Sequence, residues 1–335
     1  MRRAAILALC AILLALSWWR SALPSQNHDE TVRFTALDVS AMPPTPGSQF
    51  AVAGAWVLAS NGDDFGGYSA LEVLPTGHFL ALSDRGRLLI FSDPSLGSPL
   101  ARMGWFLAAD TQDKRAVDIE DSTLDPARGM LWVSYEQRNA IVRVGADRTG
   151  PHTVRPPAMR DWPDNRGPEA MTRLADGRFI VLSESGHGWF DTSGPALLFP
   201  DDPVEGAVPV SFSFRAPRFF RPTAMAALPD GRVLILVRRL LWPVPARFSA
   251  RLLIADPRDI RPGRVWEGRE VVRFAAPVPV DNFEGLAVRR EPGGQNSVWI
   301  ISDDNNALSQ RTILLRLDWR GAARKKGAEE NPAPR

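Results

Sequence analysis

Residues 169–184 read EAMTRLADGRFIVLSE, and this stretch has the pattern of a β-hairpin. A strand-like run precedes Asp176-Gly177, and an almost wholly apolar run then leads to a serine and an acid. Glycine supplies the positive φ that a tight turn needs. The apolar return run is typical of a strand buried on both faces between neighbouring sheets. One such hairpin cannot bury both of its faces, so we expect several to pack together.

The same theme occurs five times along the chain. Its copies occupy residues 69–84, 120–136, 169–184, 223–238 and 284–303. Successive copies start 51, 49, 54 and 61 residues apart, which is near the size of one propeller blade. The fifth copy carries a four-residue insertion around Pro292-Gly293-Gly294. The repeats therefore predict an all-β fold, a β-propeller.

The number of blades depends on residues 32–58, which contain strand-like sequence but no copy of the theme. This segment would either complete a sixth blade or close the ring by pairing with the last one. We favour six blades, with five as the alternative. No linker composition appears within residues 31–318, so we expect one propeller domain there. Residues 319–335 are basic and poor in apolar side chains, which indicates a disordered tail.

Residues 1–22 have the composition of a signal peptide or an N-terminal membrane anchor. Arg2-Arg3 precede an apolar run at residues 4–19, and Ser21-Ala22 offer small residues near a cleavage point. The sixteen-residue run is shorter than the roughly twenty residues of a membrane span, which favours cleavage. If retained, the segment would attach the protein to the membrane. We therefore expect a periplasmic or secreted protein.

Composition and motifs exclude several classes of function. The chain has 40 basic and 38 acidic residues, so it offers no support for a nucleic-acid partner. Its four histidines lack metal-ligand spacing, and no phosphate-binding glycine loop precedes a helix. The segment Gly67-Tyr68-Ser69-Ala70-Leu71 lacks the final glycine of a serine elbow. A conventional serine hydrolase, zinc enzyme or nucleotide enzyme is not indicated.

The first residue of each repeat is the candidate for chemistry. Glu120, Glu169 and Glu284 occupy this position, and Ser69 and Thr223 fill it in the other two copies. In a propeller, equivalent positions on the innermost strands converge on one end of the central channel. Carboxylates brought close repel unless a cation offsets their charge, and calcium prefers such oxygen ligands. We therefore predict a calcium site whose candidate ligands are Glu120, Glu169, Glu284, Asp121 and Asp303.

A structural interpretation of the same residues stays open. Acidic and hydroxyl side chains at strand starts often bind backbone groups of a neighbouring strand, and this interpretation covers all five copies. Arg85 and Arg166 lie beside the repeat ends. Their guanidinium groups suit phosphate or carboxylate, although each could instead pair with a neighbouring acid.

Four segments and a tail resemble the phytase-like family described as having esterase-like activity. They are residues 67–71, 118–121, 166–171 and 281–286, with the tail at 302–305. The resemblance spans roughly residues 50–318 and implies an exported β-propeller that hydrolyses a small-molecule ester or phosphate ester. By this resemblance Glu120, Glu169 and Glu284 hold the cation, and the candidate catalytic residues are Glu169, Glu284, Arg85 and Arg166. Thr223 and Arg238 stand where further acids would complete a ring of ligands.

Two other functions remain open. The run Glu284-Gly285-Leu286-Ala287-Val288 is also similar to gluconolactonase-type propellers, which would imply one divalent ion activating water on a lactone. The other alternative is a non-catalytic propeller that binds a ligand or partner, because propellers host many unrelated functions.

Overall fold

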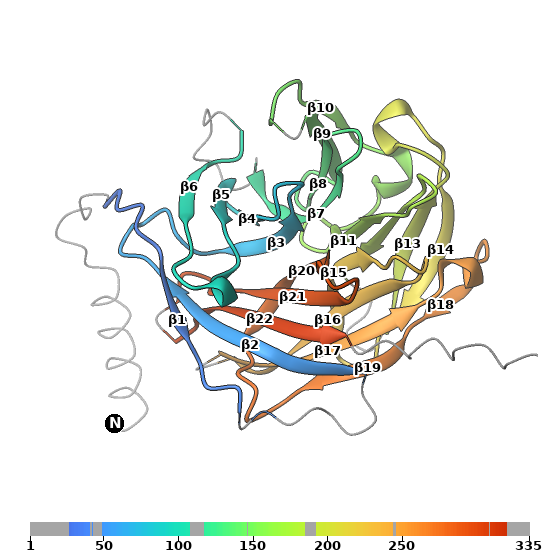
Figure 1. Ribbon diagram of the computed structural model, residues 1–335. Helices are drawn as coiled ribbons and strands as arrows, with labels where there is room; N and C mark the ends of the chain where they lie inside the picture. Colours follow the sequence, from blue (N-terminus) through green and yellow to red (C-terminus); the bar gives the residue numbers. More distant parts are fainter. Residues whose placement is uncertain are drawn as a thin grey trace, which may run out of the picture.

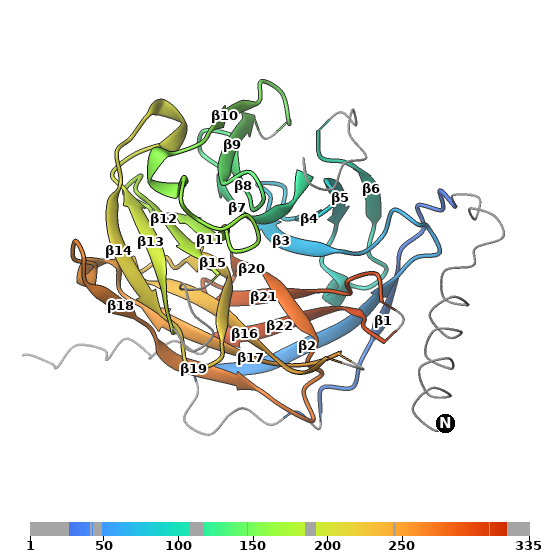
Figure 2. The same cartoon turned by 180° about the vertical axis from the view of Figure 1, so that it is seen from behind.

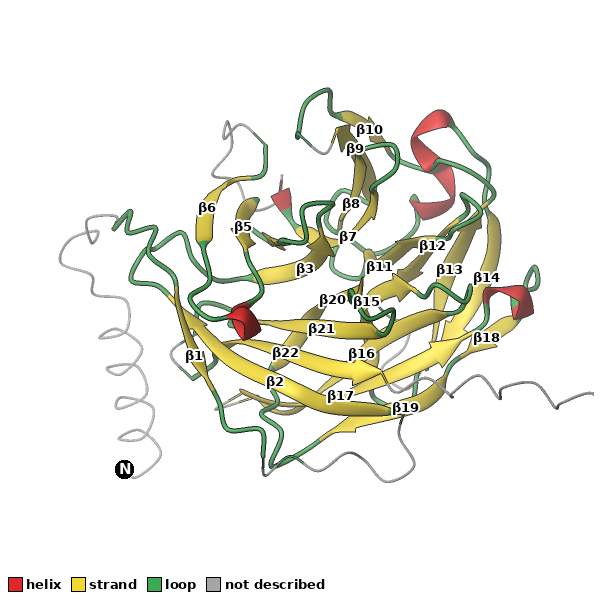
Figure 3. Ribbon diagram, in the orientation of Figure 1, coloured by secondary structure: helices red, strands yellow, loops and turns green. Residues whose placement is uncertain are grey.

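The computed structural model describes residues 27–40, 42, 49–107, 117–145, 147–184, 192–243, 246–307 and 309–319. The predicted leader at residues 1–22 and nearly all of the predicted tail lie outside these residues. The described chain forms 22 strands, joined by turns and by short 3-10 helices that include Pro94–Leu96 and Pro203–Glu205. Figure 3 shows that strands dominate the molecule. No helix in the described part is long and apolar enough to cross a membrane.

The strands form five sheets, which we call blades 1 to 5 in chain order of their innermost strands. Blade 1 contains β3 (Tyr68–Val73), β4 (Phe79–Ser83), β5 (Arg87–Phe91) and β6 (Ala101–Trp105). Blade 2 contains β7 (Ile119–Asp125), β8 (Met130–Tyr135), β9 (Ala140–Gly145) and β10 (His152–Val154). Blade 3 contains β11 (Pro168–Arg173), β12 (Phe179–Ser183), β13 (Ser193–Phe199), β14 (Val210–Arg215) and β18 (Val265–Glu267).

Blade 4 contains β15 (Arg221–Ala227), β16 (Val233–Pro243), β17 (Ala246–Ala255) and β19 (Arg269–Phe274). Blade 5 contains β20 (Asn282–Arg290), β21 (Asn296–Asp303), β22 (Thr312–Trp319), β2 (Phe50–Ala59) and β1 (Arg33–Ala36). The blades surround a central channel lined by their innermost strands (Figures 1 and 2). The predicted β-propeller is therefore confirmed.

The ring is closed by the segment that lacks a repeat. Strand β2 pairs antiparallel with β22, from Leu58 opposite Thr312 to Phe50 opposite Trp319. The innermost strand of blade 5, β20, contacts β3 of blade 1. The segment at 32–58 thus completes the last blade and forms none of its own. The described chain has five blades, the alternative considered above, which corrects the preference for six.

Each interface between neighbouring blades contains its own apolar cluster. Strand β16 contributes side chains to two of these clusters, one on each of its faces. Leu234 and Leu236 pack toward blade 5, whereas Val233, Ile235 and Val237 pack toward blade 3. This arrangement explains why the return strands are continuously apolar rather than alternating.

The closing strand makes a testable contribution to stability. Trp56 of β2 is buried and stacks on Trp299 of β21, with ring centroids 5.8 Å apart. Trp56→Ala should lower the free energy of unfolding by about 3 kcal/mol, because it leaves a cavity where blade 5 meets blade 1. Urea denaturation measures this change. The matched control is Leu96→Ala at an exposed position, which should change stability by less than about 0.5 kcal/mol. Equal effects of both substitutions would contradict the closure.

Candidate functional site

The first residue of every repeat lies at a β-bulge in the innermost strand of its blade. The register shifts between Tyr68 and Ala70, Ile119 and Ser122, Pro168 and Ala170, Pro222 and Ala224, and Phe283 and Gly285. A bulge bends the strand and re-aims the extra side chain. The repeat detected in the sequence is therefore a repeat of bulges around one end of the channel, which we call the channel mouth.

The two hydroxyl residues at this position join neighbouring blades. Ser69 Oγ donates to the Ile119 carbonyl at 2.6 Å, and Thr223 Oγ1 donates to the Phe283 carbonyl at 3.1 Å. Each acceptor directly precedes the first residue of the next repeat. The structural interpretation therefore applies to Ser69 and Thr223, although their partners are carbonyls rather than N–H groups.

The three glutamates at this position lie in one network of carboxylates. Burial raises the pKa of Glu120 well above its ordinary value, and the negative charges of Glu284 and Glu136 raise it further. Burial likewise raises the pKa of Glu169 far above its ordinary value, and the charge of Glu120 adds to this shift. The structure thus brings together Glu120, Glu169 and Glu284 as the repeat predicted.

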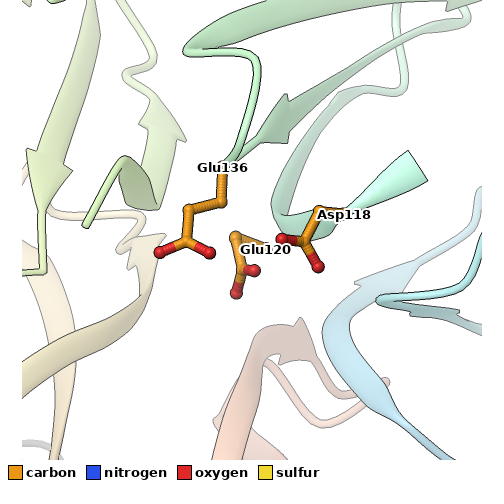
Figure 4. A group of neighbouring side chains, drawn as sticks. All are labelled: Asp118, Glu120 and Glu136. Atoms are coloured by element: carbon orange, nitrogen blue, oxygen red, sulfur yellow. The ribbon is translucent and has the colours of Figure 1, made fainter. Parts of the chain in front are cut away.

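One close group of acids among the described residues belongs to blade 2. Oxygens of Asp118, Glu120 and Glu136 lie within 4.8 Å of one another, and Figure 4 shows the three side chains converging. Asp118 directly precedes β7, Glu120 lies at its bulge, and Glu136 follows β8. Glu136 is also hydrogen-bonded to Glu169 of blade 3, and burial raises its pKa to about 7. A proton or a cation must offset the negative charge gathered here.

At the other side of the channel mouth, the guanidinium group of Arg238 lies among the acids. Arg238 Nη2 donates to Glu284 Oε1 at 2.8 Å, and the Asn282 amide donates to the same oxygen at 2.8 Å. Burial would lower the pKa of Arg238, but the charges of Glu284 and other carboxylates outweigh it and raise this pKa. Burial also raises the pKa of Asp303 to about 8, with the charge of Glu284 as the next cause. Glu284 is therefore already engaged in an ion pair.

The predicted ligands did not include Asp84, Glu136 and Glu184, the acids that follow β4, β8 and β12. Asp84 and Glu184 immediately follow the serines that end β4 and β12, and the charge of Asp84 raises the pKa of Glu284. The charge of Glu184 raises the pKa of Glu169. The signal was present in the sequence, because acids recur at the end of four of the five repeats. Read alone, each resembles an ordinary turn residue.

The remaining predicted site residues lie in different surroundings. Asp121 accepts hydrogen bonds from the backbone N–H groups of Ser122, Met171 and Met225, so its carboxylate is occupied by three blades. Arg85 is exposed and lines a cavity of about 660 Å³ with Arg87 and Trp105. Arg166 is half-buried, and its carbonyl accepts the Ser183 hydroxyl at 2.7 Å. Roles for these residues in metal binding or catalysis stay predictions.

A further acid lies inside the channel, away from the mouth. Glu72 of β3 lines a cavity of about 220 Å³ and accepts the Ser122 hydroxyl at 3.2 Å. Burial raises the pKa of Glu72 to about 8, against about 4.3 in an unfolded chain. The folded protein therefore keeps the Glu72 proton at pH values at which the unfolded chain has lost it. The stability that Glu72 contributes is complete below pH ~4.3 and is lost as the pH rises toward about 8.

The titration of Glu72 can be tested by one isosteric substitution. Glu72→Gln keeps the carbonyl acceptor but cannot ionise, so it should stabilise the protein above the raised pKa by about 2 kcal/mol after allowance for partial exposure. Denaturant unfolding across the pH range measures this difference, which should vanish in acid. Val208→Thr, at an exposed position, introduces no ionisable group and is the control, which should show no such pH dependence. A stability difference for Glu72→Gln that is independent of pH would refute the assignment.

The chain was compared with protein-family models, curated proteins and solved structures. A family model described as "Phytase-like: Esterase-like activity of phytase" matches residues 63–306. No curated protein matches the chain.

Among solved structures, the PQQ-bound aldose sugar dehydrogenase of Streptomyces coelicolor is 13% identical, with 82% of this chain and 99% of that chain covered and a TM-score of 0.46. A thermostable family-43 glycoside hydrolase is 12% identical, with 81% and 96% covered and a TM-score of 0.47. Hydrazine synthase of Kuenenia stuttgartiensis is 15% identical, and the match covers 72% of this chain but only 58% of that one, with a TM-score of 0.38.

Proposed function

Since this chain belongs to the phytase-like family described by esterase-like activity of phytase, we propose that it hydrolyses phosphate esters or other esters of small molecules. We propose further that the channel mouth binds calcium for this reaction. The observation that carries the proposal is the group formed by Asp118, Glu120 and Glu136, whose oxygens lie within 4.8 Å of one another. Calcium–oxygen distances of roughly 2.3–2.6 Å place the oxygens of one shell at most about 5 Å apart, so this group fits the ion.

The donor chemistry also fits a hard cation. The group offers only carboxylate oxygens, which calcium prefers, and calcium tolerates irregular geometry. Asp118, Glu120 and Glu136 would hold the ion, with Glu169 beside them through its hydrogen bond to Glu136. Glu284 is a weaker candidate ligand because Arg238 and Asn282 already bind one of its oxygens. When bound, calcium would offset the charge of the cluster and polarise the carbonyl or phosphoryl oxygen of the substrate, whose carbon or phosphorus water attacks.

The protein side chains have roles of their own in this proposal. Glu169 shares a hydrogen bond with Glu136, and the pKa of each carboxyl is raised by burial. Glu169 can therefore keep the shared proton near neutral pH while Glu136 binds the ion, and can deliver that proton to a leaving oxygen. Glu284 holds Arg238 at the mouth, where its guanidinium can face an anionic substrate. Arg85 and Arg166 are proposed to bind the phosphate or carboxylate of the substrate from the same end of the propeller.

The setting of the reaction follows from the sequence. The proposed leader at residues 1–22 directs the protein to the periplasm or the outside of the cell, with membrane attachment through residues 4–19 if the leader is retained. Extracellular calcium sites commonly have dissociation constants of about 10⁻⁴–10⁻³ M, so a site of modest affinity suits this setting.

A second candidate function is lactone hydrolysis. The observation that favours it is the gathering of carboxylates at the mouth, where the charges of Glu284, Glu184, Glu169 and Glu120 all act on the guanidinium of Arg238. Such a surface repels a phosphate ester more strongly than an uncharged lactone or carboxylic ester. One ion held by few ligands is sufficient for that chemistry.

The experiment is hydrolysis by the purified full chain in calcium and again in chelator. The substrates are phytate, an aryl phosphate, an aryl carboxylic ester and an aldonolactone. Calcium-dependent phosphate release supports the first proposal, and cleavage of the lactone or aryl ester alone favours the second. No turnover of any substrate, with folding verified by circular dichroism, would reject both and favour a propeller that only binds a ligand.

A further inference from the structure

One hairpin projects beyond the propeller ring. Strands β16 and β17 have 11 and 10 residues, whereas the second strands of blades 1 and 3 have five residues each. Strand β16 runs toward the channel mouth and reaches it at Arg238, which pairs with Glu284 there. Residues 239–243 therefore extend past the face of the propeller that carries the acidic cluster.

The end of this hairpin is apolar and exposed. Leu240, Leu241 and Trp242 are 50%, 49% and 61% exposed. Phe219 is 44% exposed and lies beside the base of the hairpin, because the adjoining Phe220 ring contacts Arg239. Single exposed apolar side chains are normal on a protein surface, whereas contiguous apolar patches mark contact sites. Consecutive exposed apolar side chains at the end of a hairpin therefore indicate a contact site. We call Phe219 and residues 240–242 the tip patch.

Three arginines lie beside the tip patch. Arg218, Arg239 and Arg247 form no ion pair with any residue in the described ranges. The Arg218 guanidinium lies 4.6 Å from the centre of the Phe219 ring, and that of Arg239 lies 5.1 Å from the Phe220 ring. Arg247 is exposed and pairs in register with Trp242 at the tip. The tip patch therefore combines exposed apolar groups with positive charge that no carboxylate of the described ranges pairs with.

A groove of about 660 Å³ continues from the tip patch along the hairpin toward blade 5. Its lining includes Leu241, Phe248, Val278 and Val280, together with Arg247 and Arg311. Asp281 also lines the groove and accepts the backbone N–H of Arg311 at 3.0 Å. The groove thus presents apolar walls with basic groups at its side.

We propose that the tip patch docks on the surface of an anionic lipid bilayer. Leu241 and Trp242 enter the interfacial region, where Trp is characteristically found, and the exposed Arg218 and Arg247 face the negative headgroups. The acidic channel mouth would repel the same headgroups, so the arginines are needed on this face to reverse the local charge.

The position of the N-terminal chain agrees with this orientation. The described chain begins at Asn27, whose N–H donates to Asp63 at 2.9 Å. Asp63 belongs to the loop that enters β3 at the channel mouth. The described chain therefore begins on the face from which the hairpin projects. Docking would turn the channel mouth toward the membrane and restrict access to substrates that approach along it.

The test combines vesicle flotation with hydrogen exchange of the full chain. Vesicles contain phosphatidylcholine alone or phosphatidylcholine with phosphatidylglycerol. We expect binding to the anionic vesicles that weakens with salt, and slowed exchange at residues 239–247 in the bound protein. Because this readout is local, it reports on the hairpin even if residues 4–19 also hold the protein on the vesicle.

Two variants and a matched control complete the test. Leu241→Ser/Trp242→Ser should abolish the protection of the hairpin. Arg218→Gln/Arg247→Gln, which changes only exposed side chains, should weaken binding to anionic vesicles by roughly tenfold or more. Leu96→Ser/Arg290→Gln alters exposed residues at the opposite end of the propeller and should bind as the unmodified protein does. Unchanged exchange at 239–247 on vesicles would overturn the proposal. Protection that depends on protein concentration without vesicles would assign the patch to a second copy instead.

Discussion

Glu120→Gln is expected to lower the affinity for calcium by about 100-fold and to remove calcium-dependent turnover. Glu120 contributes to the blade 2 group with Asp118 and Glu136, and its charge also raises the pKa of Glu169. The substitution preserves size but removes the negative charge that the ion would neutralise. Thermal unfolding in calcium and in chelator measures the effect, since a ligand that binds only the folded state raises the midpoint.

The controls for this prediction are other carboxylates of the same protein. Glu267→Gln, at an exposed ion pair on β18, should leave the calcium response intact. Glu169→Ala should weaken the calcium-linked stabilisation, and Glu284→Ala should weaken it less because Glu284 is already bound by Arg238. A calcium response of Glu120→Gln equal to that of the unmodified protein would remove the blade 2 group as the cation site.

Asp121→Ala should destabilise the fold by about 3–5 kcal/mol, the largest stability effect that we expect from a single polar side chain here. Asp121 Oδ2 accepts the N–H groups of Met171 and Met225, and Oδ1 accepts that of Ser122. The truncation leaves these buried donors without an acceptor, at about 1–3 kcal/mol for each. Urea unfolding measures the loss.

A second variant, Asp121→Asn, separates the contribution of hydrogen bonding to stability from that of the charge, because an amide accepts hydrogen bonds but carries no charge. Asp121→Asn retains one carbonyl oxygen and should recover part of the stability lost in Asp121→Ala. Asp147→Asn, at an exposed turn, is the matched control and should cost less than about 0.5 kcal/mol. If Asp121→Ala proves as stable as this control, Asp121 does not hold the innermost strands together, and its place among the predicted metal ligands deserves renewed testing.

The sequence predicted the propeller because each blade repeats its own hairpin chemistry. The period, the glycine turns and the doubly buried return strands are local features, and local features can be recognised in one copy and counted in the others. The number of blades was harder to predict. Strand β2 carries no repeat, and its partner β22 lies more than 250 residues away in the chain, so only the closed ring reveals that it completes blade 5.

The candidate site was likewise predictable where its residues repeat along the chain. Glu120, Glu169 and Glu284 could be found because bulges recur at equivalent positions. Asp84, Glu136 and Glu184 were not included because each follows a strand and, read alone, resembles an ordinary turn residue. Glu136 follows Ser134 by two residues, whereas Asp84 and Glu184 directly follow their serines. The longer register shift of blade 2, between Ile119 and Ser122, accounts for this offset. The role of Asp121 could not be predicted, since its partners lie in two other blades.

The most direct test of the proposed cation site is calorimetric titration of the purified full chain with calcium on both sides of the Glu136 pKa of about 7. Ligand carboxyls must lose their protons before they bind a metal, so binding should release protons and strengthen as the pH rises through this value. We predict one ion per chain, with weaker binding and greater proton release on the acid side. No binding heat at either pH, confirmed by an unchanged unfolding midpoint, would contradict the calcium site at the channel mouth.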